Sequence, residues 1–161
     1  MDKIKTIASL KKIINKLKKQ GKKVVFTNGC FDLIHPGHIK ILKEAKKRGD
    51  ILIVGVNSDY SVKTIKGKTR PILTEKMRLT VLNALEDVDY ITIFNEPTPY
   101  KLIKSLKPDY LVKGADWGKE DIVGKNLVDK VFRVKLLKNH STTAIIKTIL
   151  KKTKGEFQKS S

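Results

Sequence analysis

The sequence predicts a single α/β domain built on an open, doubly wound, five-stranded parallel sheet. Its 161 residues are 40% hydrophobic, which is enough to form the core of one domain. Short apolar runs alternate with segments of helical periodicity, as in a sheet covered by helices. One of these runs, residues 51–56, is apolar throughout, which is typical of a parallel strand buried on both faces.

The chain begins with a predicted packing helix. An apolar stripe at helical spacing ends at Gly21, a residue type that often terminates helices. The stripe consists of Ile4, Ile7, Leu10, Ile13, Ile14 and Leu17. We assign residues 1–21 to this helix, residues 22–151 to the main domain and residues 152–161 to a frayed polar tail.

The other elements follow from apolar runs and helical spacing. The predicted strands are residues 24–26, 51–56, 90–94, 110–112 and 131–137. The predicted helices are residues 36–47, 74–85, 99–106 and 141–150. In the helix that begins at Thr74, the side chains expected to point inward are Met77, Val81, Leu82 and Leu85. Residues 57–71 are predicted to form a mobile loop or loose helix, and residues 113–126 a loop.

The segment FTNGCFDLIHPGH, residues 26–38, joins the first strand to its helix through a glycine turn. Pro36 suits a helix entrance because it needs no hydrogen-bond acceptor there, and it keeps His35 extended. Gly37 leaves room above the first-turn amides, which attract anions. His35 and His38 can therefore face one bound phosphate from two sides. In such a sheet, ligands lie at the carboxyl ends of the strands, where the unusual loops converge.

The composition limits the classes of function. The net charge of +19 would favour a polyanionic ligand, but the lysines are scattered and aromatic residues make up only 6%. We therefore do not expect nucleic acid as the main ligand. No apolar run approaches the length of a membrane span, so no membrane partner is expected. The single cysteine, Cys30, suits a reducing compartment, which favours a cytoplasmic location.

The segment FTNGCFDLIHPGH, residues 26–38, resembles the His-x-Gly-His signature of the cytidylyltransferase-like nucleotidyltransferases, a Rossmann-like superfamily. Three further blocks, NSDYSVKTIKGKTRP, LVKGADW and STTAII, resemble other blocks of that family in the same order. Within the family they are most similar to heptose 1-phosphate adenylyltransferases, the nucleotidyl-transfer half of ADP-heptose synthases. The segment LEDVDY and the KNH before STT depart from the glycerol-3-phosphate cytidylyltransferase pattern, which favours ATP over CTP.

The resemblance implies transfer of a nucleotidyl group from ATP to a small phosphorylated acceptor, with Mg²⁺ and with pyrophosphate as the leaving group. It implies catalytic roles for His35, His38 and Lys63, and a metal- or phosphate-holding role for Asp32. The implied nucleotide- and phosphate-binding set is Thr27, Asn28, Gly29, Phe31, Asp32, Gly37, Lys66, Arg70, Lys113, Gly114, Asp116, Trp117, Ser141, Thr142 and Thr143.

The residues alone leave alternatives open. The two histidines could be half of a metal site, Lys63 and Lys66 could be solvated charges, and Ser141 and Thr142 could be helix caps. The protein could instead be a glycerol-3-phosphate cytidylyltransferase, an FMN adenylyltransferase or a basic nucleotide- or RNA-binding module without turnover. A homodimer is also considered, since such enzymes are often dimers and the stripe of residues 4–17 could serve as an interface.

Overall fold

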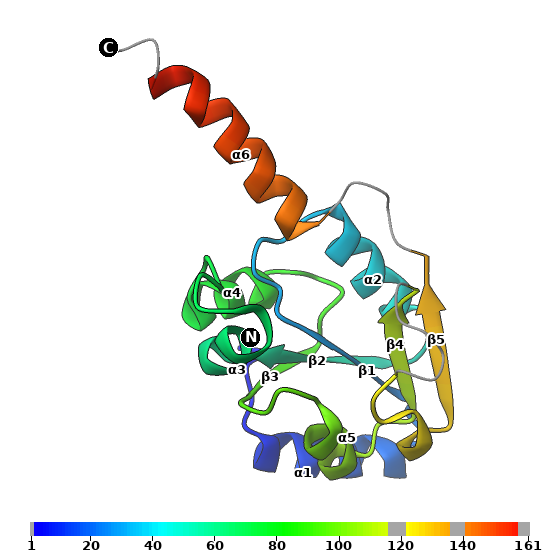
Figure 1. Cartoon of the computed structure of the whole chain (residues 1–161). Helices are drawn as coiled ribbons and strands as arrows, with labels where there is room; N and C mark the ends of the chain where they lie inside the picture. Colours follow the sequence, from blue (N-terminus) through cyan, green and yellow to red (C-terminus); the bar gives the residue numbers. More distant parts are fainter. Residues whose placement is uncertain (1, 116–121, 136–140, 158–161) are drawn as a thin grey trace.

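A five-stranded parallel sheet forms the centre of the protein. The computed structural model describes residues 2–115, 122–135 and 141–157 (Figure 1). The strands are β1 (Val24–Gly29), β2 (Ile51–Asn57), β3 (Tyr90–Phe94), β4 (Tyr110–Gly114) and β5 (Lys130–Val134). Their order in the sheet is β3-β2-β1-β4-β5, and every pairing is parallel. This order confirms the predicted doubly wound sheet.

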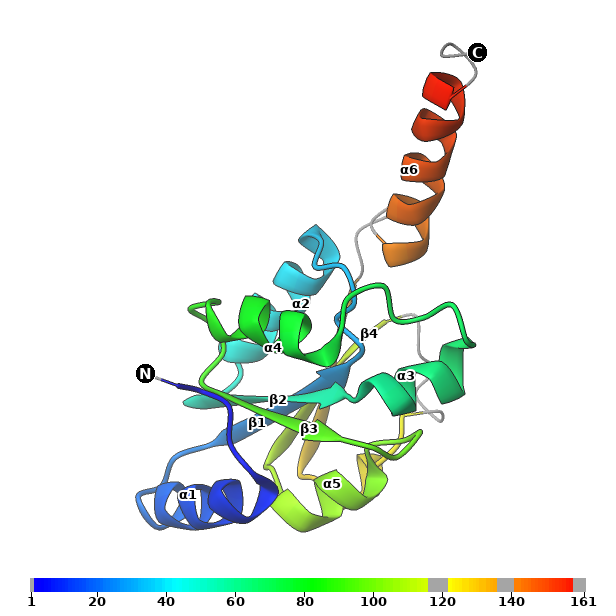
Figure 2. The same ribbon diagram turned by 90° about the vertical axis from the view of Figure 1, so that its left-hand side faces the viewer.

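Helices cover both faces of the sheet (Figure 1 and Figure 2). The elements are α1 (Ile7–Lys19), α2 (Pro36–Lys46), α3 (Asp59–Lys66), α4 (Glu75–Asn83), α5 (Tyr100–Leu106), α6 (Thr142–Phe157) and the short 3₁₀ helix η1 (Lys125–Leu127). Buried side chains of α2 and α4 pack in one core cluster with β1 and β2, and those of α1 and α5 pack in the other. The sheet is therefore buried on both faces, as the apolar run of β2 predicts.

The carboxyl ends of the strands lie at one edge of the sheet, where the site residues were predicted to meet. Gly29 at the end of β1 pairs with Val56, and Asn57 at the end of β2 pairs with Phe94. β1 lies between β2 and β4, so the strand order reverses at β1. This reversal is the topological switch point, the usual ligand position in doubly wound folds.

Two predictions about helix packing are wrong. Ile4 lies outside α1 and instead forms an isolated bridge with Ile91. Of the side chains predicted to face inward from α4, Leu82 is fully buried and Leu85 packs against the same core cluster, as expected, but Met77 is 51% exposed and Val81 is 39% exposed. The buried face of α4 instead includes Arg78, because Arg78 finds hydrogen-bond acceptors inside the protein.

The segments predicted as irregular contain more helix than expected. Residues 59–66 form the regular helix α3, whose first turn is capped by Ser58, so the helical alternative for residues 57–71 is confirmed over those positions. The last helix runs to Phe157, beyond its predicted end at residue 150. α6 projects away from the rest of the protein (Figure 1).

In the described part of the chain, no helix is long and apolar enough to span a membrane. The division of the chain at residues 21 and 151 stays a prediction.

Candidate phosphate-binding site

The two histidines lie at the start of α2. His35 is the N-cap residue with extended backbone, and Pro36 occupies the first turn. The Nδ1 atom of His35 accepts a hydrogen bond of 3.1 Å from the amide of Gly37. In a neutral His35 the proton therefore lies on Nε2, where it can be donated. The predicted helix entrance is thus confirmed, and its cap is a histidine ring.

His38 stacks on His35 in the first turn of α2. The ring centroids are 3.9 Å apart, and the ring of Phe31 lies 5.1 Å from His38 on another side. Burial, followed by the charges of His35 and Lys66, lowers the pKa of His38 from 6.5 to about 4, although the backbone of Leu33 opposes this. His38 is therefore neutral at pH 7, and its Nδ1 atom is buried without a hydrogen-bond partner among the described residues.

Asp32 is occupied by hydrogen bonds within the protein, and its predicted metal- or phosphate-holding role stays a prediction. Its side chain is 1% exposed, and its two oxygens accept hydrogen bonds from the amides of Ile72 and Leu73 and from Arg70 Nε. These three donors make four contacts, because the amide of Ile72 lies within hydrogen-bond distance of both oxygens. A carboxylate has about four lone-pair positions for accepting hydrogen bonds, so all of them are used. Burial alone would raise the pKa of Asp32, but the amides of Leu73 and Ile72 and the pairing with Arg70 outweigh it and lower the pKa. The described residues also contain no group of three metal-ligand side chains. Asp32 anchors the segment that contains Arg70.

Two of the three predicted basic residues lie near the loop between β1 and α2, Lys66 close to His38 and Arg70 at Asp32. Arg70 forms an ion pair of 2.7 Å with Asp32 through Nε. Lys66, the last residue of α3, is close enough for its charge to lower the pKa of His38. Lys63 is exposed on α3, and among the described residues no hydrogen bond or ion pair joins it to the histidines. The catalytic role of Lys63 stays a prediction without structural support.

Polar groups of β1 and β4 meet at the switch point. Lys113 Nζ donates a short hydrogen bond to Asn28 Oδ1, which places an ammonium group between the ends of the two strands. Thr27 is buried beside them, and Gly114 ends β4. Gly29 packs so closely on Phe31 that a Cβ there would lie 3.3 Å from its ring. The predicted residues of these two strands therefore lie together at the edge of the sheet.

The start of α6 provides a second helix N-terminus near the histidines. It lies close to the first turn of α2 in both views (Figure 1 and Figure 2). Ser141 Oγ accepts a hydrogen bond of 3.1 Å from the amide of Ala144, so the capping role of Ser141 is confirmed. Thr142 and Thr143 form the first turn. Asp116 and Trp117, which were predicted to frame the nucleotide or sugar, lie outside the described residues.

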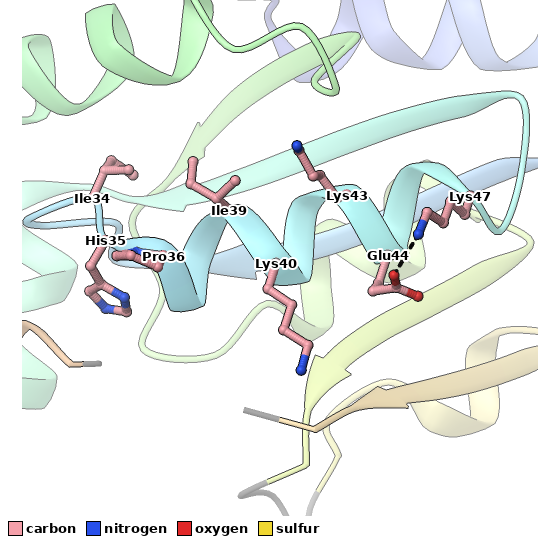
Figure 3. A pocket seen from close by; sticks show the side chains of 8 residues that line it. All are labelled: Ile34, His35, Pro36, Ile39, Lys40, Lys43, Glu44 and Lys47. Atoms are coloured by element: carbon pink, nitrogen blue, oxygen red, sulfur yellow. Dashed lines mark hydrogen bonds and ion pairs between the residues drawn. The ribbon is translucent and has the colours of Figure 1, made fainter. Parts of the chain in front are cut away.

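A groove of about 610 Å³ runs along the outer side of α2 (Figure 3). Its apolar part comes from Ile34, Pro36 and Ile39, and its rim from lysine side chains of the same helix. Figure 3 shows the ring of His35 pointing away from Ile34 and Ile39. His35 also lines this groove, whereas the strand ends contribute nothing to it. The groove therefore reaches the histidine end of α2 but not the polar residues of β1 and β4.

Sequence reasoning missed Arg78, which is fully buried and touches the same loops. The available signal was an arginine, one of four in the chain, inside an amphipathic helix next to inward-facing leucines. Arginines fully removed from water are rare and are almost always paired. Such a residue is a candidate for organising the site.

A doubly wound parallel sheet with two histidines and two helix starts at its switch point is the architecture of a nucleotide-binding α/β domain. A family model described as cytidylyltransferase-like matches residues 26–158. The chain belongs to the cytidylyltransferase-like family and is a nucleotidyltransferase. Members of this family use a divalent metal. The family resemblance inferred from the sequence motifs is confirmed.

Three comparisons place the chain more closely. It is 51% identical over 146 residues to the bifunctional protein HldE of Aliarcobacter butzleri, covering 91% of this chain and 31% of that relative. The chain therefore spans about a third of the length of the curated relatives it matches. The crystal structure of the lipopolysaccharide core biosynthesis protein from Thermoplasma volcanium is 33% identical with a TM-score of 0.64, over 73% of this chain and 100% of that one. Pantoate-beta-alanine ligase from Francisella tularensis, at 20% identity and a TM-score of 0.63 over 86% and 68% of the two chains, shares the fold.

Proposed function

We propose that this protein transfers AMP from ATP to heptose 1-phosphate and releases pyrophosphate, giving ADP-heptose. The observation that carries the proposal is the 51% identity with a bifunctional HldE protein over 91% of the chain. The sequence blocks after β2, at β4 and at α6 point to the same subfamily. The Thermoplasma volcanium neighbour, described as a lipopolysaccharide core biosynthesis protein, agrees with a role in envelope polysaccharide synthesis.

The reaction needs positioning more than proton transfer. An oxygen of the acceptor phosphate attacks the α-phosphorus of ATP, a new P–O bond forms, and the bond to the pyrophosphate oxygen breaks in line. A phosphate monoester is already a nucleophile at neutral pH, so no strong base is required. The catalytic contribution comes from groups that orient both phosphates and stabilise the charge of the transition state.

The described residues can supply those groups. His35 and neutral His38 each have one N–H to donate to a phosphate oxygen, and the first-turn amides of α2 add dipoles. Arg70 keeps its two terminal nitrogens for phosphate while its Nε holds Asp32. Lys113, which bonds Asn28 at the strand ends, and Ser141, which caps α6, would hold the rest of the triphosphate. This assignment of binding roles is part of the proposal.

We propose Mg²⁺ as the metal. When bound, it would neutralise charge on the leaving pyrophosphate. Because Asp32 is saturated by hydrogen bonds, we expect the nucleotide's own phosphates to supply the ligands of the metal.

A cytoplasmic location and a homodimer are further parts of the proposal. Light scattering of the purified protein tests the homodimer.

Pyrophosphate release tests the reaction. The protein is incubated with Mg²⁺, with either ATP or CTP, and with heptose 1-phosphate, glycerol 3-phosphate or FMN as acceptor. We expect release with ATP and heptose 1-phosphate, and its loss in His38→Ala. Lys11→Ala, an exposed position on α1, is the matched control and should keep full activity. Turnover with CTP and glycerol 3-phosphate, or no turnover with any pair, would contradict the proposal.

A further inference from the structure

Arg78 is a buried cation that lies behind the site. Its side chain is 0% exposed in the second turn of α4. The guanidinium donates to three acceptors: Nε to the carbonyl of Leu73 at 3.1 Å, Nη1 to the carbonyl of Cys30, and Nη2 to Asp59 Oδ1 at 2.8 Å. Removing a charge from water is costly unless it is paired and hydrogen-bonded, and in Arg78 each of the three guanidinium nitrogens has an acceptor, one of them a carboxylate.

The three acceptors belong to three different segments of the site. Cys30 lies in the loop between β1 and α2, five residues before His35. Asp59 is the first residue of α3, the helix that ends at Lys66. Leu73 follows Arg70 in the loop before α4. One side chain from α4 therefore connects the histidine loop with both segments that carry the basic residues.

Asp32 binds the same segment as Arg78, through the backbone of Leu73. The amide of Leu73 donates to Asp32 Oδ1 at 2.9 Å, while the carbonyl of Leu73 accepts from Arg78. Both polar backbone atoms of Leu73 are thus fixed by side chains from neighbouring segments. Because Arg70 is bonded to the same carboxylate, its position depends on this arrangement.

We propose that Arg78 is a positioning residue that holds the histidine loop, α3 and the Arg70 segment in the arrangement required for nucleotidyl transfer. The geometric part needs no assumption about the substrate, whereas the effect on turnover rests on the proposed function. A lysine keeps the charge but cannot reach three acceptors at once, since only the planar arginine fork presents donors in three directions.

The test compares Arg78→Lys with Arg48→Lys, a matched control at the exposed end of α2 where arginine pairs with Glu44. The first readout is the NMR titration of the His38 ring. In Arg78→Lys we expect the pKa of His38 to rise from about 4 toward 6.5, because the loop loosens, the ring gains water and Lys66 moves away. In the control it should stay unchanged.

The second readout is turnover with ATP and heptose 1-phosphate. We expect kcat to fall by at least about tenfold in Arg78→Lys, and the loss to shrink when Arg70 is already alanine, because the two changes act through the same group. Independent, multiplicative losses would indicate a general effect on stability and would overturn the proposal. If the wild type turns over no such substrate pair, the proposed function fails while the titration still decides the geometric part.

A variant that folds with unchanged His38 titration and unchanged kcat would overturn the proposal. If Arg78→Lys does not fold, Asp59→Asn takes its place. It leaves the two carbonyl contacts of Arg78 intact and removes only the carboxylate on α3. The same rise in the pKa of His38 is expected there, and its absence would equally overturn the proposal.

Discussion

The buried, neutral His38 predicts a loss of folding stability on mild acidification. Its pKa is about 4 in the folded protein against 6.5 for an ordinary histidine. Above pH 6.5 the ring is neutral in both states and costs nothing. As the pH falls from 6.5 to 4, the unfolded chain gains a proton that the folded protein does not take up, so the unfolded state is favoured. Below pH 4 both states are protonated and the loss is complete.

The size of this effect follows from the two pKa values. Their difference corresponds to at most about 3 kcal/mol of unfolding free energy, because one pH unit is worth about 1.4 kcal/mol at 25 °C. The partial exposure of the ring makes this an upper limit. For a domain of this size, such a loss would lower the melting temperature by roughly 10 °C.

Urea unfolding at pH 7.0, 6.0, 5.0 and 4.5 measures the effect, with His38→Asn as the reference. Asparagine has no titration in this range, so subtracting its pH dependence removes the contributions of all other groups. The wild type should lose about 2 to 3 kcal/mol more than the variant between pH 7.0 and 4.5. Parallel pH dependences for the two proteins would refute the burial and neutral state inferred for His38.

Three further predictions concern catalysis, the Asp32 contacts and packing. His38→Ala should lower kcat by at least about a hundredfold, as loss of one preorganised donor typically does, with KM for ATP nearly unchanged in steady-state assays. A change confined to KM would contradict the transition-state role. Asp32→Asn should cost about 2 kcal/mol in urea unfolding, because the amide has one acceptor oxygen for contacts that now use two, and unchanged stability would contradict the saturated carboxylate. Gly55→Ala should cost about 1–3 kcal/mol, since its Cβ would lie 2.7 Å from the ring of Phe26, and a neutral melting curve would show that the ring can move.

The sheet and its ligand edge were predictable because their signals are local. A parallel strand buried on both faces is a continuous apolar run, and the strand at residues 51–56 was located from such a run; the other four strands were located from shorter or interrupted apolar segments. Once the strands alternate with helices, the carboxyl edge is fixed by topology. The positions of His35 and His38 then follow from the short distance between strand and helix. The general location of the site therefore needed no long-range information.

The errors concern contacts between residues far apart in the sequence. In α4, hydrophobicity correctly places Leu82 inside, but it also favours Met77 and Val81 over Arg78. Arg78 is buried because it finds acceptors that lie 48 and 19 residues earlier in the chain. No local pattern contains that information.

The same reason applies to the contacts of Asp32. An acidic residue next to a glycine turn suggests a cation, but its oxygens are used by amides 40 and 41 residues later. The end of α6 was missed for a different reason. Its lysine-rich final turns look like a solvated tail, although lysine is a good helix former.

The bond between Arg70 and Asp32 also bears on how this protein distinguishes its ligands. In a chain with 35 lysines and arginines, positive potential is present almost everywhere and cannot by itself mark one place for a phosphate. A guanidinium whose plane is set by a buried carboxylate offers two donors in a fixed direction. We therefore expect selectivity here to come from the direction of the donors more than from the amount of charge.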